Sequence, residues 1–112
     1  MNALEPLIQA ISNKNSISFE YNKEGKAPGI RIGNPYAVFI FTAKNTKVQS
    51  TKVHIVQTAG VSDSKEINPF PSFRMYNIED LSNVTVLDDT FIANNESYNS
   101  EWEGYKDVIA KI

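Results

Sequence analysis

Cysteine is absent from this chain of 112 residues, which excludes disulfides, thiolate nucleophiles and cysteine-based zinc sites. Long apolar runs are missing too, since none approaches the about 18–20 residues that a membrane-spanning helix needs. The N-terminus has no basic segment followed by a long apolar one, so we expect no signal peptide. The simplest interpretation is a soluble cytoplasmic protein, and the length fits a single domain over residues 1–112.

Patterns for catalysis and for metal binding are also missing. His54 is the only histidine, and the carboxylates of Asp88 and Asp89 would point to opposite faces of a strand. No serine lies in a Gly-x-Ser-x-Gly elbow, and nothing indicates the orienting group that a serine–histidine pair would need. The sequence therefore predicts no enzyme activity, no cofactor and no metal.

The net charge of −2 at pH 7 argues against a domain that coats nucleic acid non-specifically. A local basic patch remains compatible with this net charge. The hydrophobic fraction of 41% is typical of a globular chain rather than a disordered one.

Apolar residues at helical spacing predict an N-terminal helix and a C-terminal one. The N-terminal stripe consists of Leu4, Leu7, Ile8 and Ile11, and the C-terminal stripe consists of Tyr98, Trp102, Tyr105, Ile109 and Ile112. Pro6 is tolerated only in a first turn, so the first helix should begin near residues 2–5. Residues 13–15 should end it, because asparagine tolerates the left-handed conformation.

Between the helices, alternating or continuous apolar segments predict strands. These segments are residues 16–21, 30–32, 36–42, 48–57, 73–76 and 84–87. Pro35 lacks a ladder donor and predicts a bend or bulge, and residues 44–47 predict a hairpin turn. Short strands joined by turns favour a small antiparallel barrel, since closure removes exposed edges. We expect a mainly β (α+β) fold of about five strands, with the helices covering the barrel's ends.

The stretch from Val56 to Ser64 begins as a strand and ends as a polar loop. Gly60 allows a turn where a side chain would clash. The hydroxyls of Ser62 and Ser64, with nearby backbone N–H groups, could hold an anion. However, Asp63 lies between them and would repel an anion, and such residues also form ordinary turns. A structural turn and a ligand contact both stay open.

Several segments, taken in order, carry a family resemblance over almost the whole chain: LIQAI, ISFEY, RIGNPY, VHIVQTAGVSDS and FRMYNIEDLSNVTVLDDTF. Together they resemble the WYL domain, a bacterial module with an Sm-like barrel. They are closest to a variant with a Gln-x-x-Gly-x-Ser-x-Ser stretch after the middle strand. The matching positions here are Gln57, Gly60, Ser62 and Ser64.

Later in the chain, Phe73, Arg74 and Tyr76 look like the variant's Trp-Lys-x-Phe segment. The Trp-Tyr-Leu triplet itself is absent, and residues 53–55 lie where it would be, with His54 in place of a usual basic residue. The resemblance implies an Sm/SH3-like barrel and a regulatory, ligand-sensing module of the kind attached to helix-turn-helix regulators. Its ligand would be nucleotide-like or a nucleic acid.

Strand periodicity adds a physical argument for the same kind of site. Lys52 and His54 should share one face, as should Arg74 and Tyr76. Arginine suits phosphate and tyrosine can stack on a base, so neighbouring strands would form a cationic and aromatic wall. The predicted ligand-binding residues are Arg31, Lys52, His54, Gln57, Ser62, Ser64, Arg74 and Tyr76.

Two alternatives remain open from the residues alone. Arg74 could instead form an ion pair with Glu79, Asp80 or another acid. The predicted C-terminal helix could dock on its own barrel, or it could present its aromatic stripe to a second copy, because exposed aromatic patches mark interfaces. The second option predicts a protein–protein interaction module that forms a homodimer.

Overall fold

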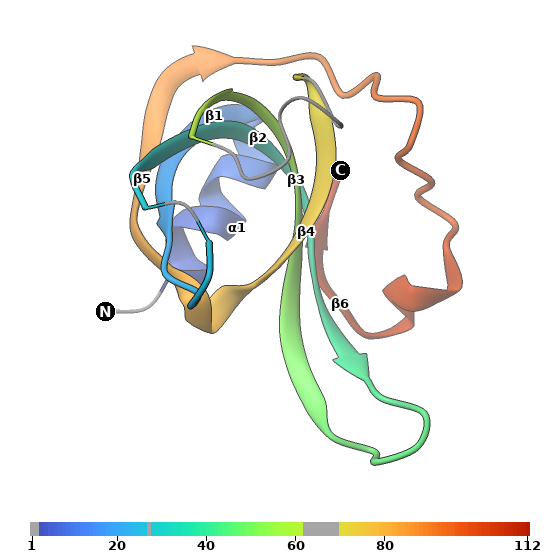
Figure 1. Cartoon of the computed structure of the whole chain (residues 1–112). Coiled ribbons are helices and arrows are strands. Elements are labelled where there is room, and N and C mark those ends of the chain that lie inside the picture. The colour runs from blue at the N-terminus through green and yellow to red at the C-terminus, as the bar shows by residue number, and fades with distance from the viewer. Residues whose placement is uncertain (1–2, 27, 62–69) are drawn as a thin grey trace.

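A six-stranded antiparallel sheet preceded by one helix forms the fold (Figure 1). The structure is a computed structural model that describes residues 3–26, 28–61 and 70–112. The elements in order are α1 (Leu4–Asn13), β1 (Asn15–Tyr21), β2 (Ile30–Thr42), β3 (Gln49–Gly60), β4 (Ser72–Asn77), the 3₁₀ helix η1 (Ile78–Asp80), β5 (Leu81–Thr90), the 3₁₀ helix η2 (Glu103–Asp107) and β6 (Val108–Lys111). The strand order is β4-β3-β2-β1-β5, and β6 also pairs with β2.

The predicted N-terminal helix is confirmed, and its apolar stripe faces the core. Leu7, Ala10 and Ile11 are buried, and they pack with apolar side chains of the sheet such as Phe19. The helix ends at Lys14, whose φ of 54° is left-handed and whose N–H bonds back to carbonyls of the last turn. A lysine rather than an asparagine thus takes the left-handed position.

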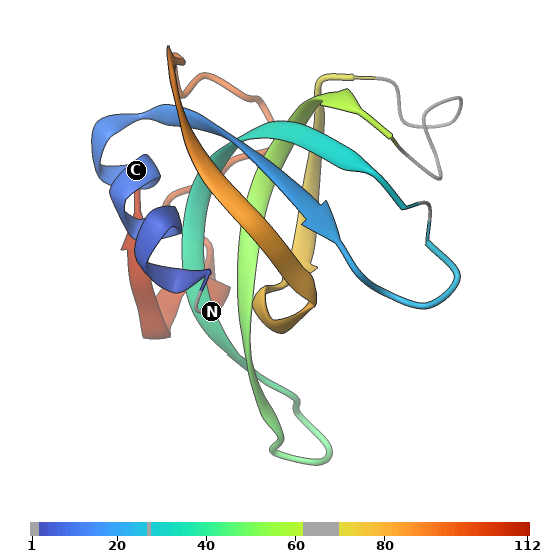
Figure 2. The ribbon, with the colours of Figure 1, turned by 90° about the vertical axis from the view of Figure 1, so that its left-hand side faces the viewer.

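The sheet curls strongly, and α1 covers one end of the curl (Figures 1 and 2). The predicted closed barrel is not formed, because the edge strands β4 and β5 make no ladder with each other over the described residues. The short η1 turn carries the chain directly from β4 into β5, which crosses to pair with β1. At this turn, the N–H of Asn22, which directly follows β1, donates to the Asp80 carbonyl at 2.7 Å.

The two segments predicted on either side of Pro35 form one continuous strand, β2, and the predicted irregularity at Pro35 is confirmed. The ladder between β2 and β3 shifts its register between Pro35 and Ala37. Along its other edge, β2 pairs with β1 at residues 30–33 and with β6 at residues 37–39. Pro35, which has no N–H to donate, lies where β2 changes partners.

The predicted C-terminal helix is wrong. Within residues 98–112, all of which the structure describes, the chain forms turns, the short 3₁₀ helix η2 and strand β6. β6 supplies ladder partners to Ala37, Val38 and Phe39 of β2, which a helix could not do. Val108 and Ile109, which are β-branched, favour a strand there.

We predict that Gly60→Ala destabilises the fold far more than Gly25→Ala. Both glycines have positive φ, 95° and 83°, so alanine is strained at either position. At Gly60 a Cβ would also lie 2.3 Å from the Ile30 carbonyl oxygen, whereas at Gly25 it would meet nothing. Chemical denaturation should show a loss of about 1–2 kcal/mol at Gly25 and a further roughly 1–3 kcal/mol at Gly60. Equal losses would contradict the close approach of β2 and β3.

Candidate functional site

One group of the predicted residues does come together, on the face of the sheet that points into the curl. Arg31, Gln57, Arg74 and Tyr76, here named the arginine cluster, meet across β2, β3 and β4. Gln57 is fully buried at their centre. Its Oε1 accepts hydrogen bonds from Arg74 Nη1 at 3.0 Å and from the Tyr76 hydroxyl at 2.9 Å.

The other end of the Gln57 side chain holds the backbone at the end of β3 and just after it. Its Nε2 donates to the carbonyls of Ala59 at 3.1 Å and Val61 at 2.8 Å. One amide therefore connects the arginine cluster to the chain segment that leaves the sheet after Gly60. Gln57 therefore links these two parts of the molecule, and its predicted contact with a ligand stays a prediction.

The two arginines of the cluster differ in depth. The Arg31 side chain is 2% exposed, and its guanidinium carbon lies 5.4 Å from the centre of the Tyr21 ring. Arg74 is half-buried. Its Nε donates to Ser72 Oγ at 3.1 Å, and its guanidinium lies 5.6 Å from the centre of the Phe70 ring.

The pKa of the Tyr76 phenol depends on burial and on the two nearby arginines. Burial raises the pKa of the Tyr76 phenol, while the guanidinium groups of Arg31 and Arg74 oppose that shift. Both positive groups therefore act on the same hydroxyl. Tyr76 also packs edge-on against Phe19 and Tyr21, with ring centres 5.4 Å and 4.8 Å away.

The opposite face of the sheet carries His54 and Lys52, so the single wall expected from the sequence is not formed. In the ladder of β3 with β4, Arg74 lies opposite Ile55, whereas His54 lies opposite Met75. Residues directly opposite each other share a face, and neighbours along a strand do not. Ser62 and Ser64, the remaining predicted residues, lie outside the described residues.

Lys52 contacts residues on its own face of the sheet. Its Nζ donates a hydrogen bond to Asn77 Oδ1 on β4. The same ammonium lies 5.7 Å from the centre of the Phe41 ring. Lys52 thus contributes a positive charge near an aromatic ring, on the side of the sheet away from Arg74.

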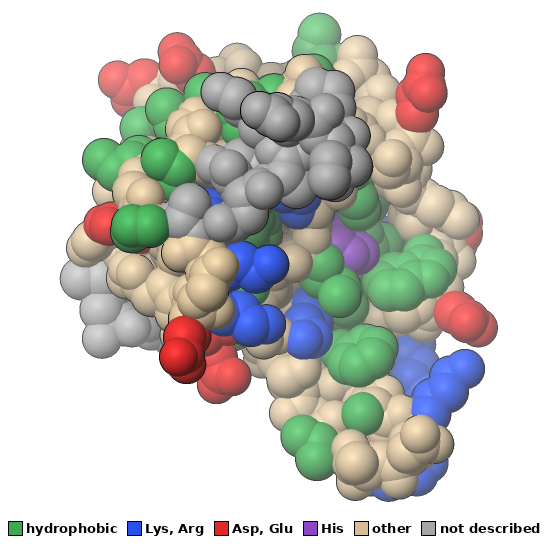
Figure 3. Space-filling model, viewed as in Figure 1, with side chains coloured by type: hydrophobic (Ala, Val, Ile, Leu, Met, Phe, Trp, Pro, Cys, Tyr) green, Lys and Arg blue, Asp and Glu red, His purple; other side chains and the backbone are tan. Residues whose placement is uncertain are grey.

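His54 lies among rings that are distant in the sequence, here named the aromatic cluster: Phe39, His54, Phe73, Trp102 and Tyr105. Its ring centre is 4.9 Å from that of Phe39 and 4.8 Å from that of Phe73. Figure 3 shows the imidazole (purple) beside hydrophobic side chains (green). His54 Nδ1 and the Tyr105 hydroxyl share a hydrogen bond of 2.6 Å.

Burial keeps this imidazole neutral. The side chain is 7% exposed, and desolvation lowers the pKa of His54 from 6.5 to about 4. Burial also raises the pKa of Tyr105, so both partners of the hydrogen bond are uncharged at neutral pH. His54 is therefore a packed, neutral residue, and its predicted contact with a ligand stays a prediction.

Sequence reasoning missed the partners that define both clusters. Tyr21 lies in a predicted strand and Ser72 outside the predicted strands, and neither is among the predicted site residues. In the structure, the Tyr21 ring lies near the Arg31 guanidinium and the Ser72 hydroxyl accepts a hydrogen bond from Arg74. The spacing of Trp102 and Tyr105 marks an aromatic stripe but predicts a helix there. The excess of aromatics after residue 97 was the available signal, and only the fold shows that these rings cover His54.

The described residues contain no group of three or more His, Asp and Glu side chains that could hold a metal ion. No helix in this part of the chain is both long enough and apolar enough to cross a membrane. No family model, curated protein or solved structure matches the chain.

We predict that NMR titration of the single imidazole gives an apparent pKa near 4. The folded pKa is below the unfolded value of 6.5, so stability is lost as pH falls from about 6.5 toward 4. The difference corresponds to at most roughly 3 kcal/mol.

The control for this titration is Tyr105→Phe. It keeps the rings packed while removing the hydroxyl, so the pKa should stay low because burial is its cause. A wild-type pKa close to 6.5 would show that the imidazole is solvated and that the aromatic cluster is not packed as described.

Proposed function

We propose that this protein is a non-enzymatic, ligand-sensing module whose arginine cluster binds a nucleotide-like anion. The observation that carries the proposal is that the chain has just two arginines and both lie on the inner face of the sheet, where Arg74 and Tyr76 donate to the same Gln57 oxygen. In a chain of net charge −2, this concentrates the planar, phosphate-matching cations at one end of the curled sheet.

The different burial of the two arginines suggests a different role for each in ligand binding. Arg74 is half-buried and can reach a ligand at the surface. Arg31 is 2% exposed, so its buried guanidinium adds positive potential to the site without contacting the ligand directly. Such a fixed charge in a low-dielectric setting strengthens anion binding at the mouth of the site.

Gln57 offers a route from binding to a change in the chain. Its Oε1 is shared by Arg74 and Tyr76, and its Nε2 holds the Ala59 and Val61 carbonyls. A phosphate that attracts Arg74 would weaken the hydrogen bond between Arg74 and Gln57. The Gln57 side chain would then hold the Ala59 and Val61 carbonyls less firmly. This is the local event that a sensing module needs.

Binding is proposed rather than turnover because of the groups present. The described members of the arginine cluster offer guanidinium, amide and phenol groups, and the pKa of the phenol is raised. None of these is a general base near neutral pH. The helix that precedes a curled antiparallel sheet also supports the proposed membership in the WYL-like class, although this sheet is open.

We predict that Arg74→Ala weakens binding of mononucleotides or short single-stranded oligonucleotides about 10-fold or more. A charge-assisted hydrogen bond contributes roughly 1.5–3 kcal/mol, and each 1.4 kcal/mol is a factor of ten. Calorimetric titration at low and high salt measures the loss, and the wild-type affinity should fall as salt rises.

Lys52→Ala is the matched control, since it removes a cation from the opposite face and should leave the affinity nearly unchanged. Arg74→Lys keeps the charge but not the planar fork, and should bind with intermediate affinity. Thermal melts identify variants that fail to fold. The proposal is rejected if wild type shows no saturable binding at low salt, or if Arg74→Ala binds like wild type.

A second candidate function is self-association through the C-terminal segment. Its aromatic and aliphatic side chains remain partly exposed, with Trp102 at 38%, Val108 at 37% and Ile109 at 39%. Partly exposed apolar side chains on consecutive elements are typical of interfaces.

If this second candidate is right, light scattering should show a dimer, and Ile109→Lys should convert it to a monomer. The substitution places a charge on an exposed position of β6 and leaves the core intact. A wild-type protein that is monomeric at all accessible concentrations would remove the candidate.

A further inference from the structure

A hollow of about 370 Å³ lies between the β2–β3 hairpin and η2, away from the arginine cluster. Its lining includes Ile40, Phe41, Lys44, Trp102, Glu103 and Lys106. The hairpin protrudes from the body of the molecule beside this region (Figures 1 and 2). The volume is within the range of small-molecule sites, about 300–1,000 Å³.

Trp102 forms a fixed wall of this hollow. Its indole packs edge-on against Phe39 and Tyr105, with ring centres 5.6 Å and 5.2 Å away. It also lies so close to the Gly104 backbone that a Cβ there would be 2.3 Å from the ring. Yet 38% of the side chain is exposed. A ring already held in place loses little conformational freedom when a ligand stacks on it.

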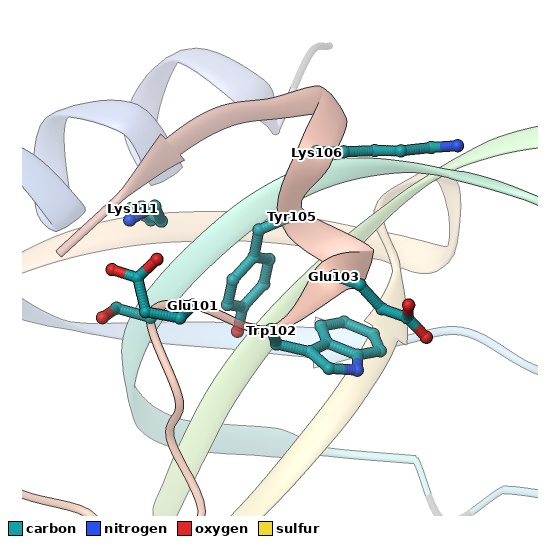
Figure 4. Close-up of a pocket in the computed structure, with 7 residues that line it drawn as sticks. Glu101, Trp102, Glu103, Tyr105, Lys106 and Lys111 are labelled. Carbon is teal, nitrogen blue, oxygen red and sulfur yellow. The ribbon is translucent and has the colours of Figure 1, made fainter.

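Phe41 and several charges complete the surroundings. The Phe41 side chain is 39% exposed. Lys44 and Lys106 contribute positive charge to the lining, and Glu103 adds one carboxylate. A second, smaller hollow shares Trp102, Glu103 and Lys106, and Figure 4 shows these side chains around the η2 turn.

We propose that this hollow is a second binding site, for a nucleotide whose base stacks on Trp102 and whose phosphate contacts Lys44 and Lys106. Aromatic stacking is sequence-tolerant and contributes about 1–3 kcal/mol per base, and lysines add electrostatic attraction for the phosphate. An acidic peptide could use the lysines, but it would not need the exposed, preorganised indole. The site does not depend on the arginine cluster.

The test uses the single tryptophan of the chain. The indole N–H resonance of Trp102 is followed by NMR as adenosine monophosphate, adenosine and inorganic phosphate are added separately to the full chain. Adenosine monophosphate should shift the resonance saturably, adenosine should do so with weaker affinity, and phosphate alone should leave it nearly unmoved.

Charge variants should move the affinity for adenosine monophosphate in opposite directions. Lys106→Ala should weaken binding roughly two- to fivefold, and Glu103→Gln should strengthen it by a similar factor, as expected for exposed charges. Both side chains are exposed, so the variants should fold normally. Arg74→Ala should leave this response unchanged, which separates the site from the arginine cluster.

The proposal is overturned if millimolar adenosine monophosphate leaves the indole resonance unmoved. It is also overturned if the two charge variants shift the affinity in the same direction, or if an acidic peptide produces a larger response than the nucleotide. A shift that depends on protein concentration instead of nucleotide would indicate a second copy of the chain at this surface.

Discussion

The register of β3 against β4 is the constraint on which the rest of the structure depends. Residues 53–57 of β3 are buried on both sides of the sheet. Val53, Ile55 and Gln57 point into the curl, and His54 lies against the aromatic rings on the other face. A shift by one residue would exchange these two sets, placing a neutral amide outside and an imidazole in the apolar core.

Each face of the strand therefore has its own chemistry. Inside the curl, Gln57 accepts hydrogen bonds from the Arg74 guanidinium and the Tyr76 phenol, and it donates to the carbonyls of Ala59 and Val61. On the other face, rings from β2, β4, η2 and the turn before η2 enclose the neutral His54. The C-terminal segment covers that second face, so its departure from a helix is what creates the indole wall and the hollow beside it.

Local sequence patterns predicted much of the fold because they act over a few residues. The stripe of Leu7 and Ile11 fixed α1, and the missing N–H of Pro35 marked the irregularity of β2. The pairing of Lys52 with His54 on one face, and of Arg74 with Tyr76 on one face, also followed from strand periodicity. The candidate site was gathered in part, since Arg31, Gln57, Arg74 and Tyr76 do meet.

Longer-range choices could not be read from the chain. Periodicity assigns residues to faces within a strand, but the alignment between strands decides which faces coincide, and it separated His54 from Arg74. The spacing of Tyr98, Trp102 and Tyr105 is compatible with a helix. It is equally compatible with an irregular segment whose rings pack against β2. Residues 37–39 of β2 favour the strand over the helix, because their backbone groups need hydrogen-bond partners and β6 provides them.

The central claim is that the sheet separates the arginine cluster from the aromatic cluster, and nuclear Overhauser contacts of the single imidazole test it most directly. The account predicts contacts from His54 ring protons to those of Phe73, Trp102 and Tyr105, while Tyr76 ring protons contact Phe19 and Tyr21. Contacts from His54 to the Tyr76 ring or to the Arg74 side chain would contradict it, because they would place both clusters on one face.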